Sequence, residues 1–179
     1  MWAAAAVLAL CALAFWAYNA LVRLRFTADS AWSDIDVQLK RRYDLIPNLV
    51  ETVKGYAGHE RETLEAVIRA RSRAQEAVTP GDRAEAEGLL AHSLKSLFAL
   101  AESYPQLRAV ESFTQLQATL ESIEEAVQNA RRYYNAVVRD LNTKIAQFPT
   151  NLIAITFGIK PREFFEIAAV ERDVPKVSF

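Results

Sequence analysis

Cysteine, glycine, proline and histidine are scarce in this chain. Its 179 residues include one cysteine, five glycines, six prolines and two histidines. A single cysteine, Cys11, excludes a disulfide framework within the chain and any zinc site built from several cysteines. Because glycine and proline are few and 51% of the residues are hydrophobic, we expect a packed core rather than a disordered chain.

An excess of charge of either sign is also lacking. The chain carries 21 basic and 22 acidic residues, and its formal net charge is −1. Proteins that bind nucleic acid usually show a basic excess, and the sequence contains no DNA- or RNA-reading motif. We therefore expect no nucleic-acid partner. The length is typical of one domain together with an anchor.

The first 22 residues lack charged side chains altogether. At about 1.5 Å per residue, a helix of this length spans a hydrocarbon core of about 30 Å. Aromatic and basic residues favour membrane interfaces, and here they flank the apolar segment. The sequence predicts a transmembrane anchor over residues 1–22, with interface residues Trp2, Trp16, Tyr18, Arg23 and Arg25.

Two other interpretations of this segment are a cleaved signal peptide and a lipoprotein signal that ends at Cys11. A signal peptide has a basic region before its apolar run, which is missing here, and Leu10 stands where a lipoprotein signal has a small residue. A retained anchor is therefore favoured. Because Arg23 and Arg25 follow the segment, the positive-inside rule predicts a single-pass protein of the cell membrane with its C-terminal domain in the cytoplasm.

Beyond the anchor, apolar residues recur at helical spacing. This pattern predicts four helical segments, over residues 28–57, 59–78, 82–103 and 105–147. We expect Asp29 or Ser30 to cap the first segment and Pro47 to kink it. Residues 79–82, with the sequence Thr-Pro-Gly-Asp, mark a turn, and Pro105 suits a first helical turn.

The predicted fold is therefore all-α: an N-terminal transmembrane helix followed by an antiparallel up-and-down bundle of about four long helices. The alternative is a long extended helical hairpin, in which the chain does not break at Gly58 and Pro105. The bundle is favoured because it buries every apolar stripe within one chain, whereas the hairpin exposes them.

Three parts follow from this pattern: the anchor over 1–22, the bundle over 23–149, and a C-terminal part over 150–179 with short helical segments and an extended tail. In the last part, Thr150 and Asn151 are expected to cap a helix over 152–157 that stops at Gly158. A helical turn is expected at 163–167 and an extended end at 174–179.

Several long motifs in this chain resemble the LemA family. They occur in order along almost the whole sequence, at residues 18–25, 31–50, 53–60, 102–107, 130–135, 142–149 and 175–179. The resemblance implies an N-terminal anchor and an α-helical bundle. The family has no established enzymatic activity and no agreed catalytic residues, and one branch of it is associated with magnetosome membranes.

The residues themselves also give little sign of catalysis. A metal site needs several converging ligands, but only His59 and His92 are present, and both suit a polar helix surface. Cys11 lies in the apolar segment without a base, and no phosphate-binding glycine loop or nucleophile elbow occurs. We therefore expect no enzyme, no metal and no cofactor. The basic run 40–42 is expected to pair with Asp36, Asp44 or a neighbouring helix.

Two sets of residues are candidates for binding. A partner surface is predicted at Arg131, Arg132, Tyr133 and Tyr134, since arginine and tyrosine are common interface anchors. The same side chains could instead pack between the first and fourth segments. A membrane-proximal block is predicted at Leu152, Ile153, Ile155, Phe157, Phe164 and Phe165. Its alternative role is to cap the open end of the bundle.

The function that fits these features is a membrane-anchored scaffold or adaptor. Besides membrane lipid, its expected partners are further copies of the chain, in a homo-oligomer, or another membrane protein. The alternative is a membrane-shaping or membrane-stress protein that acts on the bilayer directly.

Overall fold

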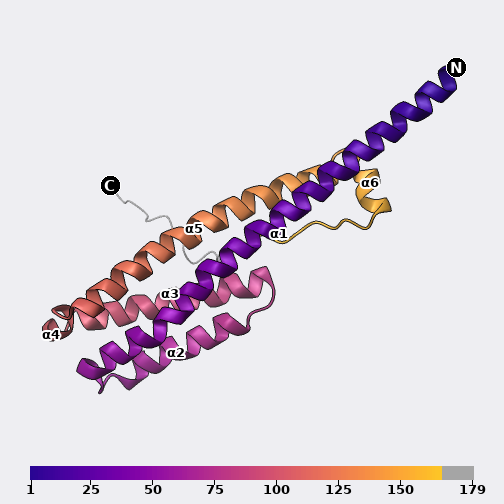
Figure 1. Cartoon of the computed structure of the whole chain (residues 1–179). Helices are drawn as coiled ribbons and strands as arrows, with labels where there is room; N and C mark the ends of the chain where they lie inside the picture. The colour runs from indigo at the N-terminus through magenta and orange to yellow at the C-terminus, as the bar shows by residue number, and fades with distance from the viewer. Residues whose placement is uncertain (167–179) are drawn as a thin grey trace, which may run out of the picture. The chain divides into compact units, whose positions relative to one another are not determined.

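The computed structural model describes residues 1–166, and this part of the chain is helical with no strand. The helices are α1 (Trp2–Ala57), α2 (Arg61–Glu76), α3 (Pro80–Ala101), α4 (Pro105–Arg108), α5 (Glu111–Ala146) and α6 (Thr150–Thr156) (Figure 1). The all-α prediction is confirmed. The extended end predicted at 174–179 lies outside the described residues.

The chain divides into two compact units, and α1 and α5 contribute to both. Unit 1 combines Met1–Asp36 with Asn129–Phe164, and unit 2 combines Val37–Gln128 with the described residues Phe165 and Glu166. Unit 1 therefore holds the apolar start of α1, the end of α5 and α6. Unit 2 holds the end of α1, all of α2, α3 and α4, and the start of α5.

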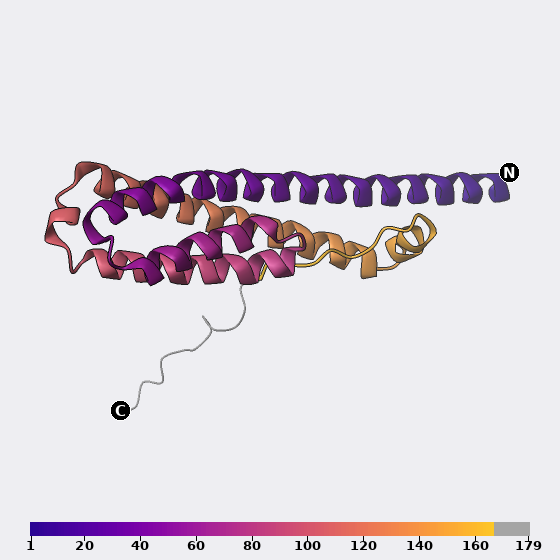
Figure 2. The ribbon, with the colours of Figure 1, turned by 90° about the horizontal axis from the view of Figure 1, so that it is seen from below.

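Unit 2 is an up-and-down bundle of helices. Figure 2 shows α2 and α3 side by side, and short connections link each helix to the next. The last turns of α1 contact all three other long segments, through Arg42 and Tyr43. The extended hairpin is therefore not the structure, because the chain turns back after Ala57 and again after Ala101.

Local signals determine the turn between α2 and α3 as predicted. Pro80 opens α3, where its missing N–H costs nothing, and the Thr79 hydroxyl accepts a hydrogen bond from the Asp82 amide over 3.1 Å. The apolar stripe of α3 then faces the interior, with Leu90 and Leu97 fully buried.

The prediction of one unbroken fourth helix was wrong. The chain forms the short helix α4, turns at Ala109 and Val110, and only then begins α5. The amide of Val110 bonds to the carbonyl of Leu107, and the amide of Phe113 bonds to that of Val110, both tighter i-to-i−3 bonds. Leu107 is fully buried, so this corner inserts an apolar side chain into the core of unit 2.

The predicted cap at Asp29 or Ser30 was also wrong, because α1 is one continuous helix. The Asp29 carboxylate instead accepts a hydrogen bond from the Arg162 guanidinium over 2.6 Å, within unit 1. Asp29 therefore lies in the middle of a helix and binds a residue that is remote in sequence. The preference of aspartate for helix caps does not decide where α1 begins.

The stop predicted at Gly158 is confirmed. Gly158 has φ +64°, and the amide of Ile159 bonds back to the carbonyl of Ala154 over 2.9 Å, which closes α6 in the manner of a Schellman cap. Thr150, however, does not cap α6. Its hydroxyl bonds to the carbonyls of Lys144 and Gln147 and so satisfies the end of α5.

The helical turn predicted at 163–167 is wrong for residues 163–166, which are not helical, and Ile167 lies outside the described residues. The backbone there bonds to side chains of α5 instead. Arg162 exchanges two hydrogen bonds with the Asn142 side chain, each 2.9 Å long, and Tyr134 donates to the Glu163 carbonyl over 3.0 Å. These bonds hold the segment extended along α5 in unit 1.

Candidate functional site

One helix in the described part of the chain is long and apolar enough to cross a membrane, and it is α1. Its residues from Trp2 to Trp16 are almost all exposed, whereas Ala17 and Leu21 are buried within unit 1. Arg23 and Arg25 are exposed. The predicted anchor therefore has an exposed stretch, from Trp2 to Trp16, followed by a stretch in which Ala17 and Leu21 are buried against other residues of unit 1.

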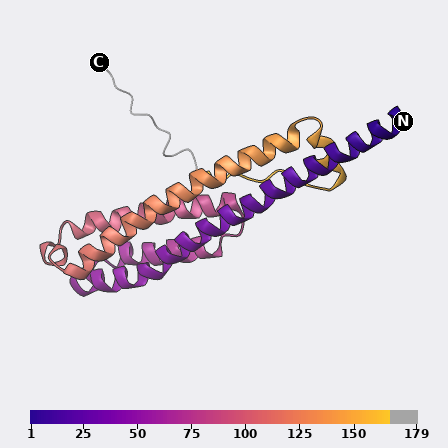
Figure 3. The same cartoon turned by 45° about the horizontal axis from the view of Figure 1, so that its top comes forward.

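Helix α6 lies beside α1 where the exposed stretch of α1 ends, near Trp16 and Tyr18, as the view in Figure 3 also indicates. The Phe157 ring contacts the Tyr18 ring, with centroids 4.6 Å apart. The Lys144 ammonium, at the end of α5, lies 5.4 Å from the centre of the Trp16 ring, within cation–π distance. Both aromatic residues predicted at this membrane interface therefore contact the α5–α6 region.

The predicted membrane-proximal block does not form one surface. Leu152, Ile155 and Phe157 are exposed, Ile153 and Phe164 are half-buried, and Phe165 is fully buried in unit 2. Phe148, which begins this block, is 79% exposed. The exposed apolar residues therefore gather on α6 and the turn before it.

The predicted partner surface is likewise divided. Arg132 and Tyr133 are exposed, and Arg132 donates a hydrogen bond to the Asn129 side chain. Arg131 is half-buried. Tyr134 is buried, and its ring packs 5.2 Å from that of Trp32. Its position corresponds to the alternative of packing between the first and fourth segments, and burial raises the pKa of its hydroxyl.

Sequence reasoning missed a buried charged cluster in unit 2. The Arg42 guanidinium pairs with the Glu87 carboxylate at 3.1 Å and with the Glu124 carboxylate at 2.9 Å, and Tyr43 donates a hydrogen bond to Glu87. Arg42 is only 6% exposed and Glu87 only 4%. Burial raises the pKa of Glu87 and, together with the Glu87 charge, that of Tyr43.

A sequence signal for this cluster does exist. Arg42 lies within the apolar stripe of α1 at helical spacing from Leu39 and Ile46, and Glu87 lies three residues before Leu90 in α3. A charged residue at a stripe position must find a buried partner. The basic run was expected to pair with Asp44 or a neighbouring helix, and both pairings occur, since Lys40 binds Asp44 over 2.8 Å.

Pro47 shapes the α1–α2 contact in unit 2. Because proline has no N–H, the carbonyl of Tyr43, four residues earlier, loses its helical partner. The Arg71 guanidinium of α2 donates to that carbonyl over 2.8 Å. The helix therefore continues through Pro47, and a side chain of the neighbouring helix satisfies the free carbonyl.

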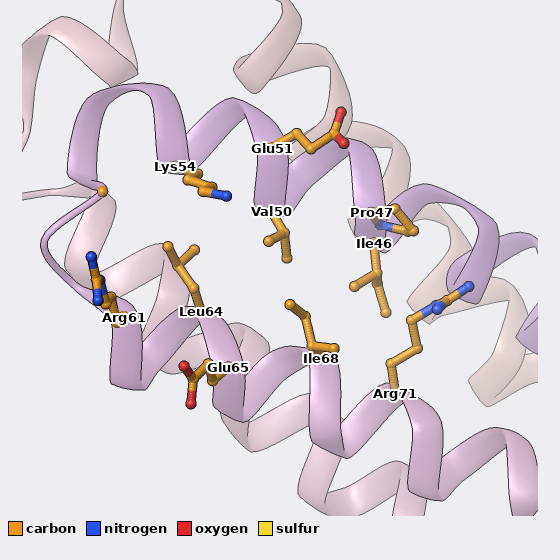
Figure 4. A pocket seen from close by; sticks show the side chains of 11 residues that line it. Ile46, Pro47, Val50, Glu51, Lys54, Arg61, Leu64, Glu65, Ile68 and Arg71 are labelled. Carbon is orange, nitrogen blue, oxygen red and sulfur yellow. The ribbon is translucent and has the colours of Figure 1, made fainter.

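Beside this contact lies an open groove of about 640 Å³ between α1 and α2. Figure 4 shows Val50 and Ile68 pointing into it from opposite helices, with Leu64 beside them. Lys54, Glu65 and other charged residues form its edges. Apolar side chains therefore line the floor of the groove, and charged side chains stand along its rim.

Among residues 1–166, no group of three or more histidine, cysteine, aspartate or glutamate side chains is arranged to hold a metal ion. His59 and His92 are both exposed. Cys11 is exposed on the apolar part of α1.

The described helices and their apolar first segment define an all-α protein with one candidate membrane helix. A family model described as the LemA family matches residues 31–179. The chain belongs to the LemA family, as its motifs indicated.

Curated relatives are distant. Magnetosome protein MamQ 2 of Paramagnetospirillum magneticum is 24% identical over 175 residues, which cover 83% of this chain and 64% of the relative. Magnetosome protein MamQ of Magnetospirillum gryphiswaldense is 24% identical with the same coverage. Protein LemA of Metamycoplasma hominis is 26% identical over 155 residues, with 86% of this chain and 71% of the relative covered. The chain thus spans somewhat less than two thirds of the length of the magnetosome proteins.

Proposed function

We propose that the protein is a membrane-anchored helical scaffold or adaptor that self-assembles or recruits membrane proteins and performs no catalysis. The observation that carries this proposal is the exposure of the apolar stretch of α1 from Trp2 to Trp16, in a helix that continues into the packed core of unit 2. Large apolar surface without protein cover is stable in lipid but not in water. The first partner is therefore membrane lipid.

The absence of catalysis is part of the proposal and is supported by the sequence. Nucleophilic catalysis needs a nucleophile beside an oriented base. The whole chain has one cysteine, which lies in the apolar segment, and two histidines, both exposed. The buried Arg42–Glu87 pair is engaged in ionic contacts within its own unit. Binding surfaces, rather than a reaction centre, are the function that we propose.

The surface proposed for partners is the exposed pair Arg132 and Tyr133 on α5. Arginine and tyrosine supply a large share of binding energy at protein interfaces, because they combine apolar area with hydrogen bonding. A second copy of the chain or another membrane protein would bind there.

The double substitution Arg132→Glu with Tyr133→Ala tests this surface. Loss of an interface hot spot of about 2 kcal/mol lowers affinity roughly 30-fold, so cross-linked complexes recovered from native membranes should decrease at least tenfold. Arg139→Glu, a charge reversal at another exposed position of α5, serves as the control and should leave recovery unchanged. Equal recovery from the double variant and wild type would contradict the proposed surface.

We also propose a single-pass topology with the residues after Arg25 in the cytoplasm, because two arginines follow the apolar segment. In a Cys11→Ala background, a cysteine placed at the exposed Gln75 should react with a membrane-impermeant maleimide only after the cells are opened. Labelling in intact spheroplasts would place the domain on the opposite side.

A further inference from the structure

The uncovered part of α1 is too short to span a membrane by itself. From Trp2 to Trp16 a helix is about 22 Å long at 1.5 Å per residue, whereas a hydrocarbon core is about 30 Å thick. Extending the span to Val22 gives about 31 Å, which matches the core. That extension includes Ala17 and Leu21, which other parts of unit 1 cover. The protein segment that packs against Ala17 and Leu21 must therefore also be stable within the membrane.

The segment in that position is uncharged. Residues 145–159, here called the α5–α6 corner, contain no acidic or basic residue, and Lys144 and Lys160 flank them. The corner exposes Phe148, Leu152, Ile155 and Phe157, and Ile155 is 77% exposed. So many large apolar side chains on one short turn form a surface that is unfavourable in water.

Several polar backbone groups of the corner are paired within the chain. The Thr150 hydroxyl bonds to the carbonyls of Lys144 and Gln147 at the end of α5. The Asn151 side chain accepts from the Leu152 amide, and the Phe157 and Ile159 amides bond back into α6. These bonds reduce the number of backbone groups that would be left without a partner in lipid.

A cationic cleft adjoins the corner within unit 1. It has a volume of about 300 Å³ and is lined by Arg25, Leu141, Gly158, Ile159, Lys160, Pro161 and Arg162. Of the three cations, Arg162 pairs with Asp29, and Glu163 and Asp140 are the acidic neighbours in sequence. Arg25 and Lys160 are both exposed, and they carry the charge that suits a phosphate group.

We propose that the α5–α6 corner is a second membrane contact, which lies in the bilayer interface beside α1 while the cleft of Arg25, Lys160 and Arg162 binds the headgroup of an anionic phospholipid. This inference rests on the anchoring proposed above and adds a lipid class and a site. Apolar side chains of an interfacial segment enter the headgroup–acyl boundary by about 5–10 Å, and the flanking basic residues remain at the phosphates. The membrane-shaping alternative would require the same contact.

Depth measurements on the full chain in vesicles test the contact. In a Cys11→Ala background, an environment-sensitive nitrobenzoxadiazole dye is attached to Ile155→Cys or, as the control, to Gln75→Cys on α2. The dye at residue 155 should emit at shorter wavelength in vesicles and be quenched by nitroxide-labelled lipids, whereas the control dye should not. Emission and quenching at 155 equal to the control would overturn the proposal.

The cleft is tested through the lipids that the protein retains. Protein purified in detergent from mixed phosphatidylglycerol and phosphatidylcholine vesicles should retain phosphatidylglycerol preferentially by native mass spectrometry. One basic residue near an anionic surface contributes about fivefold in affinity, so Arg25→Gln with Lys160→Gln should lower retention at least tenfold. Arg139→Gln is the matched control. Unchanged retention in the double variant would overturn the headgroup site, and so would inorganic phosphate that displaces the lipid at micromolar concentration, because the ligand would then be free phosphate.

Extraction with alkaline carbonate separates this proposal from the proposed function. Protein that is released from membranes by carbonate has lost the anchor, and the scaffold proposal fails with it. Protein that resists extraction while the dye at residue 155 reports water retains its anchor, and only the second contact fails.

Discussion

Replacing Arg42 with alanine should lower the melting temperature of the protein by about 10 °C. The guanidinium is the shared partner of Glu87 and Glu124, and it is almost completely shielded from water. Removing one partner of a buried ion pair costs about 3–5 kcal/mol, because an uncompensated charge stays in the interior. For chains of this size, each kcal/mol corresponds to roughly 2–4 °C. Thermal unfolding of the full chain in detergent, followed by circular dichroism, measures the effect.

Two further variants distinguish the effect of a buried unpaired charge from the effect of losing any ion pair. Lys40→Ala removes the neighbouring ion pair with Asp44, which is exposed on both sides, and should change the melting temperature by less than about 2 °C. Arg42→Met combined with Glu87→Gln removes both charges of the buried pair and should recover at least half of the loss. A melting temperature for Arg42→Ala within 2 °C of the Lys40→Ala value would show that the cluster does not stabilise unit 2.

The helices with local start and stop signals could be predicted closely from sequence. Residues 59–78 were expected for the helix that runs Arg61–Glu76, and the Thr79–Pro80 turn was placed correctly. Threonine caps, proline in the first turn and glycine with positive φ act through neighbouring backbone groups. Such signals can therefore be interpreted without knowledge of the rest of the fold.

The features that sequence did not predict depend on remote contacts. The break between α4 and α5 is hidden because Leu107, Val110 and Phe113 keep a helical period across it. The continuity of α1 is hidden because the cap-type residue Asp29 binds Arg162, 133 residues away. In both cases the local pattern does not decide where the helix begins or ends.

The candidate binding surfaces were likewise predicted only in part from sequence. The composition of the sequence could identify an apolar N-terminal segment and a set of tyrosines and arginines, but not which of them are exposed. Tyr133 and Tyr134 are adjacent in sequence, yet one is exposed and the other is buried against Trp32. The orientation of each side chain on the helix relative to its packing partners decides this. The partners of Tyr134 are Trp32 of α1 and the non-helical segment around Glu163, which was predicted from sequence to be helical.

Asn142→Ala should release that segment from α5. The Asn142 side chain donates to the Arg162 carbonyl and accepts from the Arg162 amide, so the substitution breaks both bonds and leaves two backbone groups without a partner. An unsatisfied polar group costs about 1–3 kcal/mol, and two of them correspond to a local opening that is roughly 100-fold more frequent. Hydrogen exchange of peptides that cover residues 159–164 should therefore accelerate about 100-fold, while peptides of α2 and α3 keep their wild-type rates.

Asn142→Asp provides the graded control, because its carboxylate oxygen still accepts from the Arg162 amide but can no longer donate to the carbonyl. Its exchange rate should lie between those of wild type and Asn142→Ala. Tyr134→Phe, which removes only the bond to the Glu163 carbonyl, should accelerate exchange about tenfold or less. If Asn142→Ala left exchange at residues 159–164 unchanged, the two 2.9 Å bonds would not be what holds this segment along α5 within unit 1.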